Sequence, residues 1–359
     1  MDSALFDYSL PEALIAQKPT GRRDDSKLLV VNRRAQTLSH AVFRDLPAFL
    51  PSGAMLFRNN ARVLRARLPG LRPSGGRVEC LLLREAEAPD VWWCLLRPGK
   101  KAAAAGEFSW PGAYEAVVIG RQEGQFRIRF SLPPDVSVLS LSEKIGDMPL
   151  PPYIGKARQR DAADYGSLDK ERYQTLYADP ARAVAAAAPT AGLHFSQDVL
   201  DSLAARGIQA YDLTLHVGLG TFQPIKTGTI EEHRIHREHY EIPQATRAAL
   251  AQAHATQAPR LAVGTTTLRA LEDYARKQPS GIGTYCDEAA LFIYPPQSFL
   301  GADLLLTNFH LPRSTLICLV AAFLTPGSVS GIAWLKELYA EAVARGYRFY
   351  SYGDAMLLA

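Results

Sequence analysis

Residues 260–277, which read RLAVGTTTLRALEDYARK, decide the fold class of this chain of 359 residues. The first four residues have the composition of a short strand. A glycine and three threonines separate them from a segment in which Leu268, Leu271 and Tyr274 recur at helical spacing. A strand that turns through a glycine into an amphipathic helix is a unit from which mixed α/β domains are built. We therefore predict a strand at 260–263 and a helix at 267–277.

The alternation of strands and helices continues on both sides of this stretch. Downstream, residues 303–306 predict a buried strand and residues 314–324 an apolar helix. Upstream, Ser196 has the character of an N-cap for a helix that stops at Gly207, and a strand follows through His216.

Near the N-terminus the pattern predicts two strands and one short helix. Segments 28–31 and 37–43 read as strands on either side of a turn. Ser9 and Glu12 have the spacing of a capping box, which predicts a helix to about residue 17.

The segment 63–150 has a different character, because helical periodicity fades and Gly/Pro turns separate short β-prone runs. These runs are 77–83, 91–96, 114–119 and 126–130. Several short strands at regular spacing predict a small barrel. We therefore predict an α+β fold, with a large mixed α/β catalytic domain formed by residues 1–62 plus 151–359 and an inserted small β-barrel domain at 63–150. The alternative for the insert is a rigid spacer that carries no chemistry.

The composition narrows the class of protein. Hydrophobic residues make up 47% and charged residues 21%, which is ordinary for a globular protein and excludes a disordered chain. A net charge of +4 permits nucleic-acid binding without requiring it. Four cysteines form no CxxC pair, which excludes a zinc ribbon and a CxxC redox motif. We see neither a signal peptide nor an apolar run of the ~20 residues that span a bilayer, so we expect a cytoplasmic protein.

Polar residues at the ends of predicted strands are the candidates for chemistry. In the segment 189–195, small residues around Gly192 would let a ligand approach the backbone, and Thr190 and His194 could offer a hydroxyl and an imidazole. The alternative, which spacing alone favours, is a tight turn with a hydrogen-bonded histidine.

The predicted strand that ends at His216 carries a polar stripe. Strand alternation puts Asp212, Thr214 and His216 on one face, just before Gly218 and Gly220. Polar groups at the carboxyl end of a strand are typical of a ligand site. A solvated sheet face is an equally good interpretation.

Two further segments have the same strand-end character. Thr265 and Thr266 lie between Gly264 and the predicted helix, where hydroxyls and the free N–H groups of a helix N-terminus favour an anion; the alternative is simple N-capping by one threonine. Asn308 and His310 follow the predicted strand 303–306 in the same way.

His233, His236 and His239 invite a metal interpretation. On a helix, His233 and His236 would share a face and His239 would point elsewhere, so we favour two functional or hydrogen-bonded histidines over a three-histidine metal site. In the aromatic C-terminal segment 347–354, Tyr350 and Tyr352 could stack on bases. A closing core strand is the better interpretation for at least half of these aromatics.

Taken together and in order, these segments resemble one family, the S-adenosylmethionine:tRNA ribosyltransferase-isomerases of queuosine biosynthesis. The matching motifs are FDY at 6–8, RDDS at 23–26, MPLPPYI at 148–154, RYQT at 172–175, APTAGLHF at 188–195, LHVGLGTF at 215–222, VGTT at 263–266 with Arg269, LTNFHLP at 306–312 and YRFYSYGDAM at 347–356.

The resemblance implies a large mixed α/β domain with an inserted barrel, and it implies a reaction. The ribosyl part of S-adenosylmethionine is moved onto 7-aminomethyl-7-deazaguanine at the wobble position of a tRNA and isomerised. Adenine and methionine leave, and the product is epoxyqueuosine-tRNA. S-adenosylmethionine is then a consumed substrate, and we expect no cofactor and no metal. We also expect a monomer with no membrane contact and no obligate protein partner.

The residues named so far and the resemblance together predict a site. The candidates for the catalytic base are His216, His194 and His310, because histidine exchanges protons near neutral pH. The predicted substrate-binding residues are Thr190, Gly192, Gly218, Gly220, Thr265, Thr266, Arg269 and Asn308. The predicted tRNA-binding residues are Arg58, Arg62, Arg65, Arg67, Tyr350 and Tyr352.

The chain departs from the family pattern at two places that bear on function. Asn60 and Ala61 stand where the pattern carries Asp-Thr, and His239 stands where it carries an aromatic residue. Two alternatives remain: a non-catalytic tRNA-binding protein on the same scaffold, and a metal-dependent hydrolase that uses His233 and His236.

Overall fold

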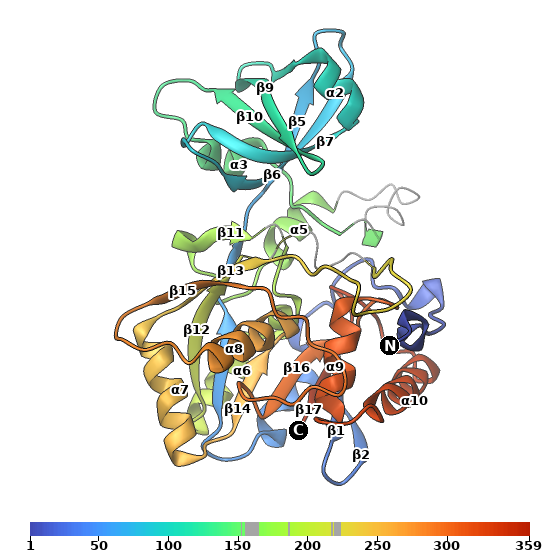
Figure 1. Ribbon diagram of the computed structural model, residues 1–359. Coiled ribbons are helices and arrows are strands. Elements are labelled where there is room, and N and C mark those ends of the chain that lie inside the picture. The colour runs from blue at the N-terminus through green and yellow to red at the C-terminus, as the bar shows by residue number, and fades with distance from the viewer. Residues whose placement is uncertain (152, 155–164, 186, 217, 219–223) are drawn as a thin grey trace.

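A computed structural model describes residues 1–151, 153–154, 165–185, 187–216, 218 and 224–359. The body is built on a nine-stranded mixed sheet, and a closed barrel stands above that body (Figure 1). Two short strands, β4 and β11, pair with each other in the body close to the barrel. Among the described residues, no helix is long and apolar enough to cross a bilayer.

The order of the large sheet is β15-β13-β12-β3-β14-β16-β17-β1-β2. Its four central strands, β12, β3, β14 and β16, are parallel, so their carboxyl ends meet at one edge of the sheet. In sheet order the strands span Tyr285–Ala289, Glu238–Ile242, Gln209–Leu215, Met55–Asn59, Arg260–Val263, Leu304–Asn308, Ala355–Leu358, Lys27–Asn32 and Thr37–Val42.

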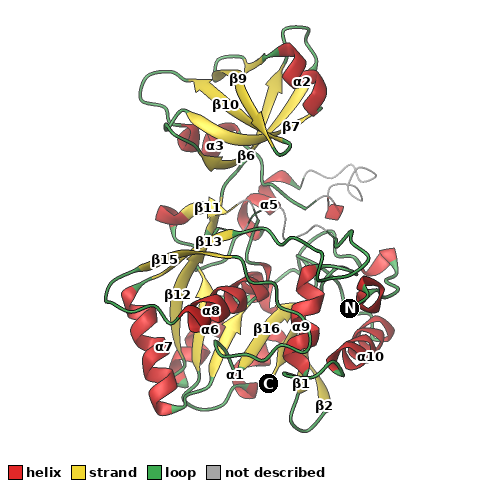
Figure 2. Ribbon diagram, in the orientation of Figure 1, coloured by secondary structure: helices red, strands yellow, loops and turns green. Residues whose placement is uncertain are grey.

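Helices cover both faces of the sheet, as Figure 2 shows. In β1, Leu29 and Val31 pack into the core that includes α7, α8, α9 and α10, whereas Leu28 and Val30 pack into the core that includes α1 and α6. This alternation is what a strand buried on both faces requires. The α-helices are α1 Leu46–Phe49, α2 Gly99–Ala105, α3 Val138–Ile145, α5 Gly166–Arg172, α6 Gln197–Ala205, α7 Gln244–Thr256, α8 Thr265–Lys277, α9 Thr315–Leu324 and α10 Gly331–Ala344. The short 3-10 helices are Ser3–Phe6, Glu12–Leu14, Arg23–Asp25, Phe43–Asp45, Pro180–Arg182 and Thr190–His194.

The barrel closes in the order β10-β7-β6-β5-β8-β9. Every second residue of β10 points inward, so Phe126, Ile128 and Phe130 are buried in its core with Trp92. The predicted barrel and the α+β fold class are therefore confirmed, whereas the domain boundaries at 62/63 and 150/151 stay a prediction. The barrel strands are β5 Arg67–Leu71, β6 Arg77–Glu85, β7 Val91–Arg97, β8 Glu107–Trp110, β9 Tyr114–Gln122 and β10 Gln125–Ser131; β4 is Arg62–Val63 and β11 is Ala183–Ala185.

The helix predicted after Ser9 is wrong. The chain forms only a 3-10 turn at Glu12–Leu14, and its N-cap is Pro11, which makes no side-chain cap. Ile15 then pairs with Phe349 in an isolated bridge, and the Ala16 N–H donates to the Phe349 carbonyl. This contact with the C-terminal segment holds the backbone extended where a helix would have continued.

Candidate active site

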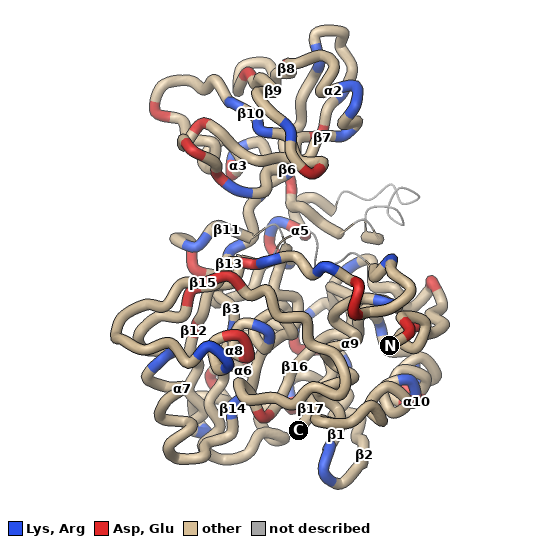
Figure 3. Tube along the Cα trace, in the orientation of Figure 1, with Lys and Arg blue, Asp and Glu red and all other residues tan. Residues whose placement is uncertain are grey.

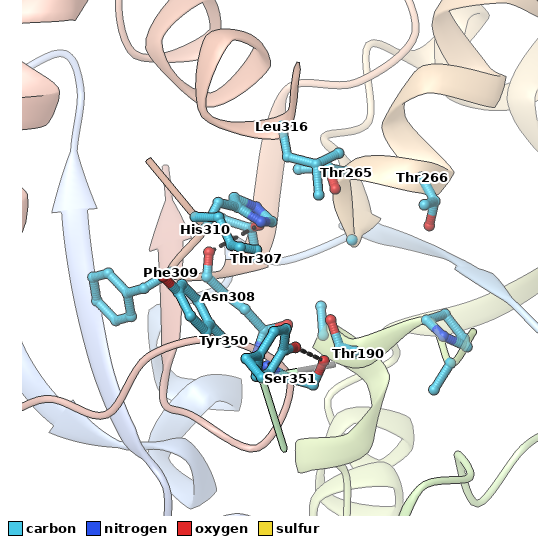
Figure 4. Close-up of a pocket in the computed structure, with 16 residues that line it drawn as sticks. Thr190, Thr265, Thr266, Thr307, Asn308, Phe309, His310, Leu316, Tyr350 and Ser351 are labelled. Carbon is cyan, nitrogen blue, oxygen red and sulfur yellow. Dashed lines mark hydrogen bonds between the residues drawn. The ribbon is translucent and has the colours of Figure 1, made fainter. Parts of the chain in front are cut away.

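The parallel strands bring three of the predicted segments to one cleft, here called the first cleft. It is lined by Thr190, by Thr265 and Thr266 at the start of α8, by Asn308 at the end of β16 and by His310 just after it. Figure 4 shows Thr265, Thr307 and His310 on one side of this cleft and Thr190, Tyr350 and Ser351 on the other. Segments that are more than a hundred residues apart in the sequence therefore share one site.

The start of α8 borders the first cleft and has no side-chain cap. The N-cap is Gly264, which has no side chain to cap the helix. Its φ of +93° suits glycine, and its N–H donates to the Leu306 carbonyl at 2.7 Å, which fixes the turn between β14 and α8. The free N–H groups of the first turn and the helix dipole favour an anion at this position.

His310 lies in the wall of the first cleft as a neutral imidazole. Burial lowers the pKa of His310 to about 3. Its Nε2 lies 2.7 Å from the Thr307 hydroxyl, and its backbone N–H donates to the Tyr339 hydroxyl at 3.0 Å. A neutral imidazole is free to accept a proton, although a low pKa also makes it a weak base.

His194 lies behind the first cleft and does not line it. Its ring is buried between Asn308 and Ser26, to which its two nitrogens are hydrogen bonded at 3.0 and 2.9 Å. Burial lowers the pKa of His194 to about 3, with smaller contributions from Arg348 and Arg23.

His216 lies at the end of β12, which β3 separates from β14 in the sheet. Two strand spacings amount to about 10 Å, and His216 is not among the residues that line the first cleft. Its backbone N–H donates to the His239 carbonyl, and its Nε2 lies 3.8 Å from a carboxylate oxygen of Glu241. Burial lowers the pKa of His216. A catalytic role for His216 stays a prediction.

The glycines of the predicted site have different surroundings. A Cβ at Gly192 would lie 2.0 Å from the Tyr177 hydroxyl, so the packing of Tyr177 requires a glycine there. Gly218 faces open space, and its N–H donates to Glu238 at 3.2 Å. Gly220 lies outside the described residues.

A second cleft shares Thr265, Thr266 and Leu316 with the first and is lined by Arg269, His233 and His236 as well. The Arg269 guanidinium already makes hydrogen bonds within the protein. It donates to Glu238 at 2.9 Å and to the carbonyls of His236 and Ala289 at 2.6 Å, while its Nε is buried with no partner among the residues that the structure describes.

The three histidines suggested as metal ligands do not converge. His239 lies on β13 with its Nε2 3.0 Å from Glu288, whereas His233 and His236 line the second cleft. Among the described residues, no three His, Cys, Asp or Glu side chains are grouped as metal ligands.

Two of the four predicted tRNA-binding arginines, Arg62 and Arg65, lie where the barrel joins the body. Arg62 and Arg65 both approach Glu143, at 3.2 and 3.6 Å. They line a cleft with Lys170 and Gln174, here called the junction cleft. Figure 3 shows Lys and Arg segments on both sides of this junction.

The other two arginines are held outside the junction cleft. Arg58 pairs with Asp212 at 2.6 Å and stacks over Tyr177, and Arg67 lies 3.4 Å from Glu79.

The two C-terminal tyrosines belong to the core. The Tyr350 ring is 4.7 Å from that of Tyr153, and Tyr350 adopts a φ of +72° while lining the first cleft. The Tyr352 hydroxyl donates to Asp169 at 2.8 Å, and its ring packs edge-on against Tyr173. Both are buried, so base stacking by either would require a movement, and that role stays a prediction.

The sequence analysis did not single out Tyr153, Thr307 and Ser351, which also line the first cleft. A signal for them existed, because each lies inside a motif that matches the family. Lys170 and Glu143 of the junction cleft lie in no such motif.

Comparison with known proteins identifies the family. The sequence profile of the family described as "Queuosine biosynthesis protein" matches residues 3–358. The chain belongs to this family.

The sequences of individual relatives match nearly the full length of the chain. An S-adenosylmethionine:tRNA ribosyltransferase-isomerase of Gloeobacter violaceus is 46% identical over 98% of this chain and 94% of the relative, and one of Acidithiobacillus ferrooxidans is 45% identical over 99% and 97%. A crystal structure of S-adenosylmethionine tRNA ribosyltransferase from Thermotoga maritima superposes with a TM-score of 0.54 and 33% identity, covering 99% of this chain and 100% of that chain.

Asn60, which departs from the pattern of the queuosine biosynthesis family, is half-buried just after β3. Its Oδ1 accepts a hydrogen bond from the Thr214 hydroxyl at 2.7 Å, and its N–H donates to the Leu213 carbonyl. An amide oxygen accepts this bond as a carboxylate would. Asn60 therefore makes a contact that an Asp could also make, without the charge of an Asp.

Proposed function

We propose that this chain is an S-adenosylmethionine:tRNA ribosyltransferase-isomerase. It transfers and isomerises the ribosyl moiety of S-adenosylmethionine onto 7-aminomethyl-7-deazaguanine at the tRNA wobble position, and it releases adenine and methionine. The observation that carries this proposal is the family match over residues 3–358, together with the convergence of the family's strand-end motifs on the first cleft.

S-adenosylmethionine occupies the first and second clefts in this proposal. The N-terminus of α8 takes the methionine carboxylate, because its N–H groups have no side-chain cap at Gly264 and its dipole attracts an anion. Thr265 and Thr266 belong to both clefts and would hold the middle of the substrate. Arg269 supplies positive charge nearby, although its guanidinium already pairs with Glu238.

The chemistry begins with removal of a proton from the ribose C5′, which the sulfonium acidifies. Adenine then leaves, the aminomethyl nitrogen of the tRNA base attacks, and methionine leaves. His310 is our preferred base, because it is neutral and lines the first cleft, whereas His194 lies behind the cleft and His216 about two strands away.

The tRNA enters from the junction cleft in this proposal. Arg62 and Arg65 share the single carboxylate of Glu143, and Lys170 lies beside them, so positive charge exceeds negative charge among the lining residues. Such a surface attracts phosphates. We further propose a cytoplasmic monomer that needs neither a metal nor another cofactor.

The deciding assay is release of adenine from S-adenosylmethionine in the presence of tRNA that carries 7-aminomethyl-7-deazaguanine. We expect adenine and methionine in equal amounts and a corresponding gain in mass of the tRNA, both unchanged after exhaustive chelation. Binding of tRNA without adenine release would favour the non-catalytic alternative. Turnover that chelation abolishes, together with stoichiometric metal in the purified protein, would favour the metal-dependent hydrolase.

A further inference from the structure

A chain of buried hydrogen bonds connects Ser26, His194 and Asn308 behind the first cleft. The Asn308 Nδ2 lies 3.0 Å from the His194 Nε2, and the His194 Nδ1 lies 2.9 Å from the Ser26 hydroxyl. All three side chains are buried, and the His194 ring packs against Phe43. The chain ends where the Ser26 hydroxyl donates to the Arg23 carbonyl at 3.3 Å.

The contacts of Asn308 favour one direction for every bond in this chain. Its Nδ2 also lies 3.5 Å from the Asp354 carbonyl, which only accepts, so the amide nitrogen faces Asp354 and His194. The His194 Nε2 must then be the unprotonated nitrogen that accepts from Asn308. A neutral imidazole has one proton, which therefore lies on Nδ1 and is donated to Ser26. The low pKa of His194, about 3 because of burial, agrees with a neutral ring.

One atom of this network has no partner. With its nitrogen held by His194 and Asp354, Asn308 has only Oδ1 left, and this oxygen is buried without a hydrogen bond in the described part of the protein. Asn308 is only 2% exposed and lines the first cleft. Buried acceptors without donors are rare in folded proteins, because their desolvation is not compensated. An acceptor held in this way is suited to a ligand that brings the donor.

We infer that His194 is a positioning residue that orients the Asn308 amide, so that its Oδ1 accepts a hydrogen bond from an N–H or O–H group of S-adenosylmethionine. The inference rests on the proposed function, since it takes S-adenosylmethionine as the ligand of the first cleft. It removes His194 from the candidates for the catalytic base, and it gives Asn308 a defined role in substrate binding.

Two substitutions of His194 test the roles of its two ring nitrogens separately. In His194→Gln the side-chain amide reaches the place of Nε2 and can still accept from Asn308. In His194→Asn it reaches only the place of Nδ1, so the bond to Ser26 survives and the bond to Asn308 is lost. We expect His194→Asn to raise the KM for S-adenosylmethionine by roughly tenfold or more, the effect of one lost hydrogen bond, with a smaller change in kcat. His194→Gln should raise KM by no more than about a quarter of that factor, a partial rescue.

Asn308→Ala supplies the matched control, because it removes the acceptor itself. It should raise KM at least as much as His194→Asn, and the double variant should be no worse than Asn308→Ala alone, since both changes act through one contact. Isothermal titration of each folded variant with S-adenosylmethionine gives the same comparison without turnover.

Two other patterns of results would overturn the inference. If His194 is the base, both substitutions abolish turnover alike, leave KM unchanged and remove the acidic limb of the kcat profile. If His194 is merely structural, both lower the melting temperature and leave KM unchanged in the folded protein. Should the variants not fold, nitrogen NMR of the wild-type protein decides, because an Nε2–H tautomer at His194 would overturn the inference. A wild-type protein that releases no adenine would instead overturn the proposed function.

Discussion

Burial keeps His194 and His310 neutral, and this has a consequence for stability. Both have a pKa of about 3 in the folded protein, against about 6.5 in the unfolded chain. Between these pH values the unfolded chain binds a proton that the folded protein does not, so the free energy of unfolding falls as the pH is lowered from 6.5 towards 3. Well below pH 6.5, each histidine contributes a slope of about 1.4 kcal/mol per pH unit.

His310→Gln should therefore flatten this acid dependence by the contribution of one proton. The measurement is denaturant unfolding at several pH values between 4 and 8, compared by slope so that a uniform loss of stability does not matter. His254, exposed on α7, provides the matched His-to-Gln control for the substitution itself. An identical slope in His310→Gln and the wild-type protein would show that His310 is not held neutral by burial.

Turnover distinguishes His310 from His216. A general base contributes ~100- to 10,000-fold to the rate, so His310→Gln should slow adenine release by a factor in that range while S-adenosylmethionine still binds. His216→Gln should have a smaller effect, because His216 lies outside the first cleft. The two variants are to be compared in single-turnover reactions after their folding is checked by melting temperature. A larger loss in His216→Gln would return the catalytic role to the end of β12.

At the scale of elements, an ion pair joins α8 to β13. Arg269 and Glu238 are only 8% and 3% exposed, and the Arg269 Nη1 lies 2.9 Å from the Glu238 Oε2. Removing one partner leaves a buried charge, so Arg269→Ala should lower the free energy of unfolding by about 3–5 kcal/mol. Adding Glu238→Gln should recover part of this loss, because the uncompensated charge disappears. Equilibrium denaturation of the two single variants and the double variant measures the coupling, and a double variant that recovers nothing would contradict it.

The elements that the sequence predicted well are those with strong local patterns. The strands at β1, β2, β12, β14 and β16 and the helices α6, α8 and α9 follow the predicted segments closely. The capping box at Ser9 failed because a tertiary bridge between Ile15 and Phe349 determined the backbone there. Local signals thus hold where no distant segment competes for the same backbone groups.

At the scale of the whole molecule, the junction cleft should bind the tRNA backbone. Replacing both Arg62 and Arg65 by Ala should weaken tRNA binding and reduce the slope of log affinity against log salt by about 1 to 2, the effect of two lost phosphate contacts. The double variant Arg34→Ala/Lys336→Ala removes the same charge from exposed sites on the β1–β2 turn and α10, distant from the barrel (Figure 1). Equal salt slopes in the two double variants would exclude the junction cleft as the tRNA-binding face.

The sequence by itself determined the fold class, four of the six barrel strands, the strand-end motifs and the family, because each depends on residue order or on short-range periodicity; β5 and β8 were not predicted. Only the tertiary structure decided which motifs meet. The parallel order β12-β3-β14-β16 places Thr265 and His310 in one cleft and leaves His216 outside it. The tertiary structure also buries His194 behind Asn308 and pairs the Arg269 guanidinium with the Glu238 carboxylate. The physical reason is that strand order and burial are set by packing between distant segments, and only that packing fixes which donors and acceptors remain for a substrate.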